Sequence, residues 1–108
     1  MRLAITGGSG FIGTAVVTRA LERDIQVLNL DRCQPRIGEQ QEFWRATDLS
    51  DEMEVVRILD SFKAEALIHL AAESEIRTSG GSISYADNTR TSGLVFSACL
   101  KRLKLPVV

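Results

Sequence analysis

The 108-residue sequence predicts an α/β fold in which a doubly wound parallel sheet is covered by helices on both faces. Three observations support this prediction. Short apolar segments alternate with helical patterns, most connections between them are long enough to hold a helix, and the first apolar segment runs directly into a glycine-rich turn. Strands joined through helices pair in parallel by right-handed crossovers. We therefore expect the strand order 3-2-1-4-5.

The expected strands are short apolar runs that end at glycine, an acid or a polar loop. The connection over residues 32–41 contains Pro35 and Gly38 and is expected to be a loop. Because the last strand has only its first residues, we interpret the chain as the front part of a longer fold, truncated at the fifth strand. The expected strands are residues 2–6, 25–30, 42–46, 66–70 and 106–108.

Helical periodicity predicts a helix over residues 11–23, a second from Ser50 to about residue 63, and a third over residues 85–104. Ser50 is the expected N-cap of the second helix, since acids follow it where free amides attract negative charge. The faces expected to be apolar are Ile12, Ala15, Val16 and Ala20 in the first helix and Met53, Val56 and Leu59 in the second.

The turn between the first strand and the first helix carries the pattern G-x-x-G-x-x-G at Gly7, Gly10 and Gly13. The early glycines permit a tight turn, Gly10 has no Cβ to block a pyrophosphate, and Gly13 allows close packing of helix and strand. Unpaired amides at a helix start, here at Phe11 and Ile12, bind phosphate. This context favours a dinucleotide site over a glycine-rich turn without a ligand.

Asp31 follows the second expected strand, 18 positions after Gly13 (31 − 13). A dinucleotide site requires an acid about 20 residues beyond the glycines, where it accepts hydrogen bonds from the adenosine ribose. A carboxylate there repels a 2′-phosphate, which favours NAD over NADP as the cofactor. Arg32 leaves NADP as a possible cofactor, because a guanidinium can bind a phosphate. The alternative interpretation of Asp31 is an ordinary acid at the end of a strand.

Composition and charge exclude several other classes of protein. Thirteen Lys and Arg against fourteen Asp and Glu give a net charge of −1, which argues against binding to nucleic acid or to an anionic membrane. No apolar run approaches the roughly 18 residues that span a bilayer. Cys33 and Cys99 lack metal-ligand spacing and indicate reduced thiols in a cytoplasmic protein. The single histidine, His69, is interpreted as a core or strand-end residue rather than as a metal ligand.

Four motifs together resemble those of the extended short-chain dehydrogenase/reductases, and within them the NAD-dependent epimerase/dehydratase family acting on nucleotide sugars. They are the glycine turn TGGSGFIG, Asp31, the pair Asp48-Leu49, and HLAAES at residues 69–74. The resemblance covers residues 1–108. It implies a Rossmann-type fold, with residues 1–108 as the N-terminal part of an NAD(P)-binding domain, and a nucleotide-sugar substrate for the full-length protein.

The resemblance also implies roles for individual residues. Asp48 would accept from the adenine amino group and Leu49 would contact the ring, although Asp48 can equally cap the next helix. Ser74 would face substrate, or is simply an exposed loop serine. Asn88 would contact the nicotinamide ribose, or cap its helix. The residues expected to line the ribose and pyrophosphate on the nicotinamide side are Leu70, Ala71 and Ala72.

The sequence departs from the family in two places. Thr91 stands where the family has glycine, and the catalytic Tyr-x-x-x-Lys pair is missing, because Tyr85 is the one tyrosine and Thr89 lies four residues on. No catalytic residue is therefore assigned, and the substrate domain is also expected to be absent. We expect an enzyme as the full-length parent and an inactive 108-residue chain that forms homo-oligomers. The alternative is a non-catalytic dinucleotide-binding or redox-sensing module.

Overall fold

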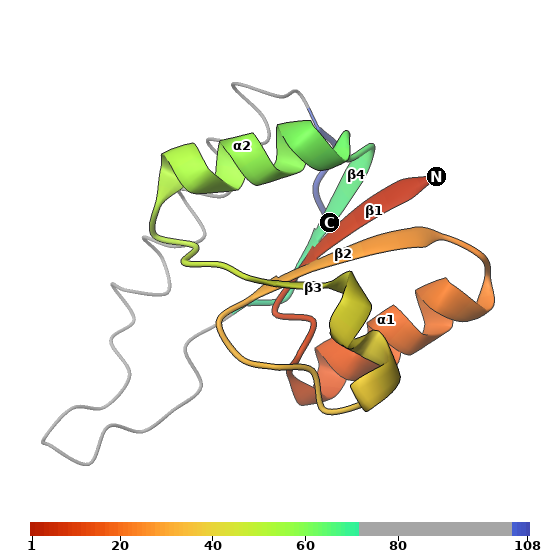
Figure 1. The fold of residues 1–108 in the computed structure, drawn as a ribbon. Coiled ribbons are helices and arrows are strands. Elements are labelled where there is room, and N and C mark those ends of the chain that lie inside the picture. The colour runs from red at the N-terminus through yellow and green to blue at the C-terminus, as the bar shows by residue number, and fades with distance from the viewer. Residues whose placement is uncertain (72–104) are drawn as a thin grey trace, which may run out of the picture.

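The computed structural model describes residues 1–71 and 105–108. Strands and helices alternate along this part of the chain, with one short 3-10 helix, η1, before the third strand (Figure 1). The elements are β1 (Arg2–Thr6), α1 (Phe11–Glu22), β2 (Gln26–Asp31), η1 (Gly38–Phe43), β3 (Trp44–Ala46), α2 (Glu52–Phe62) and β4 (Ala66–His69).

The strands form a four-stranded parallel sheet in the order β3-β2-β1-β4. Residues 106–108 lie along the free side of β4, where Val107 bridges Leu67 in parallel and the Val108 amide donates to the Leu67 carbonyl at 2.8 Å. This confirms the predicted order 3-2-1-4 and places residues 106–108 in the fifth position. The helix expected over residues 85–104 lies outside the described residues.

The helices α1 and α2 lie on opposite faces of the sheet (Figure 1). Each face carries its own apolar core. On one face Leu3 and Ile5 of β1 pack with Val17 of α1, and on the other Ala4 packs with Ile58 of α2. Successive side chains of a strand point to opposite faces, so β1 contributes to both cores. A central parallel strand is buried on both sides and reads as a continuous apolar run. The doubly wound α/β fold is therefore confirmed, and it is of the Rossmann type.

The predicted face of α1 is partly wrong. Ile12 is 65% exposed and Ala15 is also exposed, whereas the buried positions are Gly13, Val17 and Ala20. Gly13 packs against the turn after β1, and the positions four and seven residues later then face the sheet. The pattern of apolar residues predicts the wrong buried face of α1, because the residue that determines which face is buried is Gly13.

The same error occurs in α2, where Met53 is 65% exposed. The prediction of Leu59 is confirmed, but the other buried positions of this helix are Val55 and Ile58 rather than Met53 and Val56. Val56 is only partly buried and packs at the margin of the core. Met53, in the first turn, belongs to neither apolar core.

Two predicted boundaries need correction. Residues 38–43 form the helix η1 rather than a loop and the start of a strand, so β3 begins at Trp44. The N-cap of α2 is Asp51, whose side chain accepts from the Glu54 amide at 3.2 Å. Ser50 does not cap the helix, because its hydroxyl and its amide both donate to Asp48. Within residues 1–71 and 105–108 no helix is long and apolar enough to cross a membrane.

Candidate cofactor site

The glycine turn lies at the carboxyl ends of β1 and β4, where the strand order reverses. Open α/β sheets bind ligands in the crevice at such a switch point. Gly7 adopts a φ of +72°, and its amide donates to the Leu30 carbonyl at 3.1 Å. A Cβ at Gly7 would lie 2.7 Å from backbone atoms of Ala71. Glycine is therefore required here both for the turn and for the close approach of the segment after β4.

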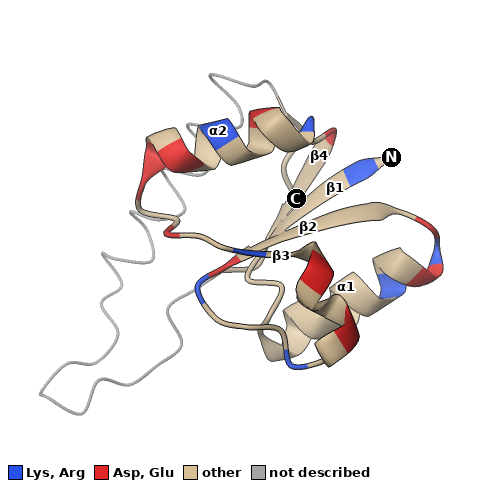
Figure 2. Cartoon of the chain, viewed as in Figure 1, with Lys and Arg blue, Asp and Glu red and all other residues tan. Residues whose placement is uncertain are grey.

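The N-terminus of α1 has no cap from a side chain and no acid in its first turn. Its N-cap is Gly10, and the Thr14 amide makes the first helical bond, to the Gly10 carbonyl at 2.9 Å. Figure 2 shows this end of α1 without charged residues. Unpaired amides with the positive end of the helix dipole attract an anion.

The last two glycines of the turn serve different purposes. A Cβ at Gly13 would overlap the Gly7 carbonyl oxygen and approach the Cα of Gly8 to 2.6 Å, so Gly13 is required by the protein itself. A Cβ at Gly10 would meet nothing closer than the Gly7 carbonyl oxygen, at 3.5 Å. Protein packing therefore leaves room for a side chain at Gly10, so the protein's own contacts do not require glycine there. Phe11 and Ile12 begin the helix, with side chains 81% and 65% exposed.

Asp31 ends β2 with its carboxylate against the glycine turn. One oxygen accepts from the Ser9 amide at 3.0 Å and the other from the Cys33 amide at 2.9 Å. An ionised carboxylate offers about four lone-pair sites, so acceptor capacity remains for the hydroxyls of a ribose. Arg32, the next residue, is exposed. The structure thus places Asp31 beside the glycine turn, as expected from the sequence pattern.

The segment after β4 is held on the other side of the glycine turn by Thr6, a fully buried residue at the end of β1. Its hydroxyl accepts from the amides of Leu70 and Ala71 at 3.1 and 3.2 Å and bonds to Nδ1 of His69 at 2.5 Å. Burial lowers the pKa of His69. Thr6 thereby fixes the start of the segment after β4 against the glycine turn, where Gly7 approaches Ala71.

Asp48 and Leu49 follow β3 at the same edge of the sheet, where the Thr47 amide donates to the Asp31 carbonyl at 3.2 Å. The Asp48 carboxylate accepts from both the hydroxyl and the amide of Ser50, and these bonds lower its pKa. Leu49 packs against the core below α2. Asp48 therefore organises its own turn rather than capping α2, and it remains exposed for a further partner.

The structure brings the glycine turn, Asp31, Leu70 and Ala71 together at the carboxyl edge of the sheet. Ser9 and Asn29 belong to this group and were missed, although a polar Asn29 within an apolar strand indicates a buried group that needs partners. In the described part of the chain no group of three His, Cys, Asp or Glu side chains could hold a metal ion. The other expected site residues, Ala72, Ser74 and Asn88, lie outside the described residues.

Comparisons with known proteins all point to one family. The model of the NAD dependent epimerase/dehydratase family matches residues 3–107. A dTDP-glucose 4,6-dehydratase of Salmonella typhimurium is 34% identical over 70% of this chain, which covers 24% of that protein. A UDP-glucose 4-epimerase of Klebsiella pneumoniae is 29% identical over 94% of the chain, which covers 81% of that protein.

Among solved structures, the Thermus thermophilus UDP-glucose 4-epimerase in complex with NAD has a TM-score of 0.76 and 27% identity. That similarity covers 94% of this chain and 34% of the epimerase. The chain thus spans about a quarter of the length of the dehydratase and a third of that epimerase. With the family model matching nearly the whole sequence, the chain belongs to the NAD dependent epimerase/dehydratase family.

Proposed function

We propose that this chain binds NAD and forms the N-terminal, cofactor-binding part of a nucleotide-sugar epimerase or dehydratase. The observation that carries the proposal is the pairing of an uncapped α1 N-terminus with the Asp31 carboxylate at one crevice. The first attracts a pyrophosphate and the second accepts from the hydroxyls of a ribose. Similarity to an epimerase that binds NAD supports the same ligand.

Each part of the crevice would hold one part of the dinucleotide. The amides of the first turn of α1 would bind the pyrophosphate, with Gly10 leaving room for it. Asp31 would bind the adenosine ribose and repel a 2′-phosphate, which favours NAD over NADP. Asp48 and Leu49 would lie on the adenine side, and Leu70 and Ala71 on the nicotinamide side. Bound NAD would accept and return a hydride.

The substrate and the reaction are proposed by analogy with the relatives, whose names specify dTDP-glucose and UDP-glucose. The chain covers only part of most of them, so the full activity would need a catalytic Tyr/Lys segment and a substrate domain in a longer protein. We expect the 108-residue chain alone to bind cofactor without turnover. A cytoplasmic location and a homo-oligomeric assembly are part of the same proposal.

The test is a calorimetric titration of the chain with NADH and with NADPH. We expect binding of NADH and clearly weaker binding of NADPH. Asp31→Asn should reduce NADH affinity by about 1.5–3 kcal/mol, because hydrogen bonds to a charged acceptor are replaced by neutral ones. The same variant should narrow the difference between NADH and NADPH, since the charge that repels the 2′-phosphate is gone.

Asp60→Asn is the matched control, because Asp60 is an exposed acid near the far end of α2 and the substitution makes the same change in net charge. It should leave both affinities unchanged. If the folded wild-type chain does not bind NADH at millimolar concentration, the proposal is wrong. If Asp31→Asn and Asp60→Asn behave alike, Asp31 is not the ribose acceptor.

A further inference from the structure

A polar network inside the protein ties the glycine turn to the end of β2, and Ser9 is at its centre. The Ser9 hydroxyl donates to the Cys33 carbonyl at 2.7 Å and accepts from Nδ2 of Asn29 at 3.0 Å. Its amide donates to Asp31, and its carbonyl accepts from Nε of Arg36 at 3.3 Å. Every polar group of Ser9 is thus bonded to β2 or to the segment that follows β2.

Asn29 makes the second connection. Its Oδ1 accepts from the Gly8 amide at 2.9 Å, while its Nδ2 donates to Ser9. The side chain belongs to a residue only 2% exposed, and Ser9 is 5% exposed. Buried polar groups are costly unless they are paired, and this carboxamide is paired at both ends. The turn therefore has a fixed position relative to β2.

This fixed position determines where the Asp31 carboxylate lies. One of its oxygens is held by the Ser9 amide and the other by the Cys33 amide. Both donors are positioned by the Ser9 hydroxyl, because that hydroxyl bonds to Asn29 on one side and to the Cys33 carbonyl on the other. Moving Ser9 or Cys33 would move the carboxylate relative to the first turn of α1.

We propose that Asn29 and Ser9 are positioning residues, which hold the ribose-binding carboxylate of Asp31 at the distance from the pyrophosphate-binding turn that a dinucleotide spans. Neither side chain touches the ligand in this proposal. They act through Asp31 and the backbone of Gly8. The inference rests on the proposed function, since it assumes that a dinucleotide occupies the crevice.

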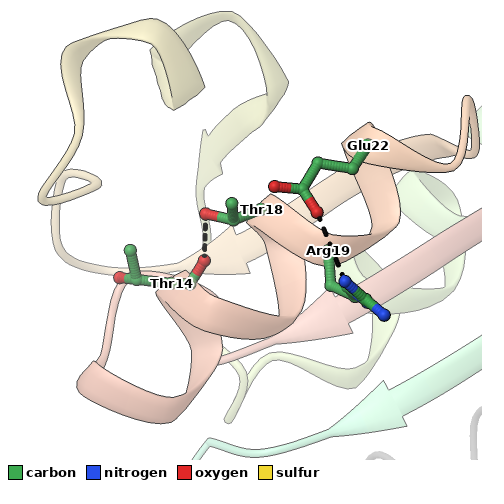
Figure 3. A network of polar contacts seen from close by, with 4 residues as sticks. All are labelled: Thr14, Thr18, Arg19 and Glu22. Carbon is green, nitrogen blue, oxygen red and sulfur yellow. Dashed lines mark hydrogen bonds and ion pairs between the residues drawn. The ribbon is translucent and has the colours of Figure 1, made fainter.

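The decisive variant is Ser9→Ala, and the chain supplies a closely matched control on α1. The Thr18 hydroxyl donates to the Thr14 carbonyl at 2.8 Å (Figure 3). It also accepts from Nε2 of Gln40 at 2.8 Å. Like that of Ser9, it therefore joins a side-chain amide to a backbone carbonyl, but outside the crevice. Thr18→Val removes this hydroxyl alone, so the two variants lose equivalent hydrogen bonds.

Affinities for ADP-ribose and for inorganic pyrophosphate are measured by calorimetry well below the melting temperature of each variant. Ser9→Ala should weaken ADP-ribose binding about tenfold, the effect of one lost buried hydrogen-bond partner. Pyrophosphate, which needs only the α1 amides, should be affected much less. Thr18→Val should lower the melting temperature comparably while leaving both affinities within about twofold of wild type. If Ser9 only stabilised the fold, Ser9→Ala would change the affinities for ADP-ribose and for pyrophosphate to the same extent.

Asn29→Leu removes the hydrogen bond to Ser9 but also leaves the Gly8 amide without its partner. A loss of affinity in Asn29→Leu could therefore come from the glycine turn itself, so Ser9→Ala decides the test. Wild-type affinity for ADP-ribose in Ser9→Ala, or equal losses for the two ligands or for the two variants, would overturn the inference while leaving the proposed function intact. Failure of the wild-type chain to bind ADP-ribose would overturn the proposed function and this inference together.

Discussion

The two described α-helices begin in opposite ways at the same edge of the sheet. α1 starts at Gly10 with no capping side chain and no acid in its first turn. α2 starts at Asp51, which accepts from the Glu54 amide, and its first turn contains Glu52 and Glu54. Figure 2 shows the difference directly, with acidic residues at the start of α2 and none at the start of α1.

The difference shows that the amides at a helix start can be bonded by the protein's own side chains, as in α2, or left without a side-chain cap, as in α1. The carboxylates of α2 satisfy its amides and its dipole, so no external anion is needed. The glycine at the N-cap of α1 makes the protein less stable, by roughly a few tenths of a kcal/mol, than a good N-cap residue would. In exchange the α1 amides remain accessible at the point where the strand order reverses.

Gly13→Ala should be the most disruptive change at α1, because the added Cβ would overlap the Gly7 carbonyl oxygen. We expect a loss of about 3 kcal/mol in the free energy of unfolding, from overpacking against backbone that has little room to move. Urea denaturation measures the effect. Gly38→Ala is the control, since a Cβ there meets nothing within 4 Å, and equal stabilities of the two variants would contradict the packing role.

Gly10→Asp would give α1 the kind of cap that α2 has. The chain should remain folded and become slightly more stable, while NADH affinity falls at least about tenfold because a carboxylate would face the pyrophosphate. Calorimetry and thermal denaturation on the same samples measure both effects. Gly10→Asn supplies a cap without the charge and should bind NADH better than Gly10→Asp. Undiminished binding by the aspartate variant would mean that the α1 amides do not hold the phosphates.

Asp51→Ala would make α2 resemble α1 by removing its cap. We expect a loss of about 1 kcal/mol in the free energy of unfolding and no change in cofactor affinity. Ser50→Ala tests the residue that sequence reasoning favoured as the cap. Its hydroxyl bonds only to exposed Asp48 in this structure, so the cost should stay within about 0.5 kcal/mol. A larger cost for Ser50→Ala than for Asp51→Ala would reverse the assignment of the cap.

The smallest effect concerns pH and the other side of the crevice. Burial lowers the pKa of His69 below its ordinary value of 6.5, so between the two values the unfolded chain binds more protons than the folded one. Stability should therefore fall as the pH drops through and below about 6.5. Melting temperatures between pH 7.5 and 5 measure the change. His69→Asn should flatten this dependence, and an unchanged slope would assign it to another group.

The prediction of the fold succeeded where the information is local. The apolar run of β1, buried on both faces, and the glycine turn after it are readable from consecutive residues, and the order of the sheet follows from the crossovers. The buried faces of the helices were harder to predict from the sequence. Ile12 is as apolar as any core residue, yet it is exposed because Gly13 must contact the turn.

For the candidate site, residue type and spacing identified Gly10 and Asp31, because amides at a helix start and a carboxylate at a strand end have the same surroundings in any fold of this class. They did not identify Ser9 or Asn29. The partner of Asn29 Oδ1 is the amide of Gly8, which lies 21 residues away in the sequence and comes within 2.9 Å only when β1 and β2 are paired.

The sequence alone predicts the α/β fold, the glycine turn before the first helix and the acid at the end of the second strand, since these depend on patterns among neighbouring residues. Which face of each helix is buried, that Asp51 rather than Ser50 caps α2, and that Ser9 and Asn29 tie the glycine turn to β2 are decided only when the chain is folded. The physical reason is that a buried polar group or a close-packed glycine is defined by its partner, and these partners meet only when distant segments have been brought together.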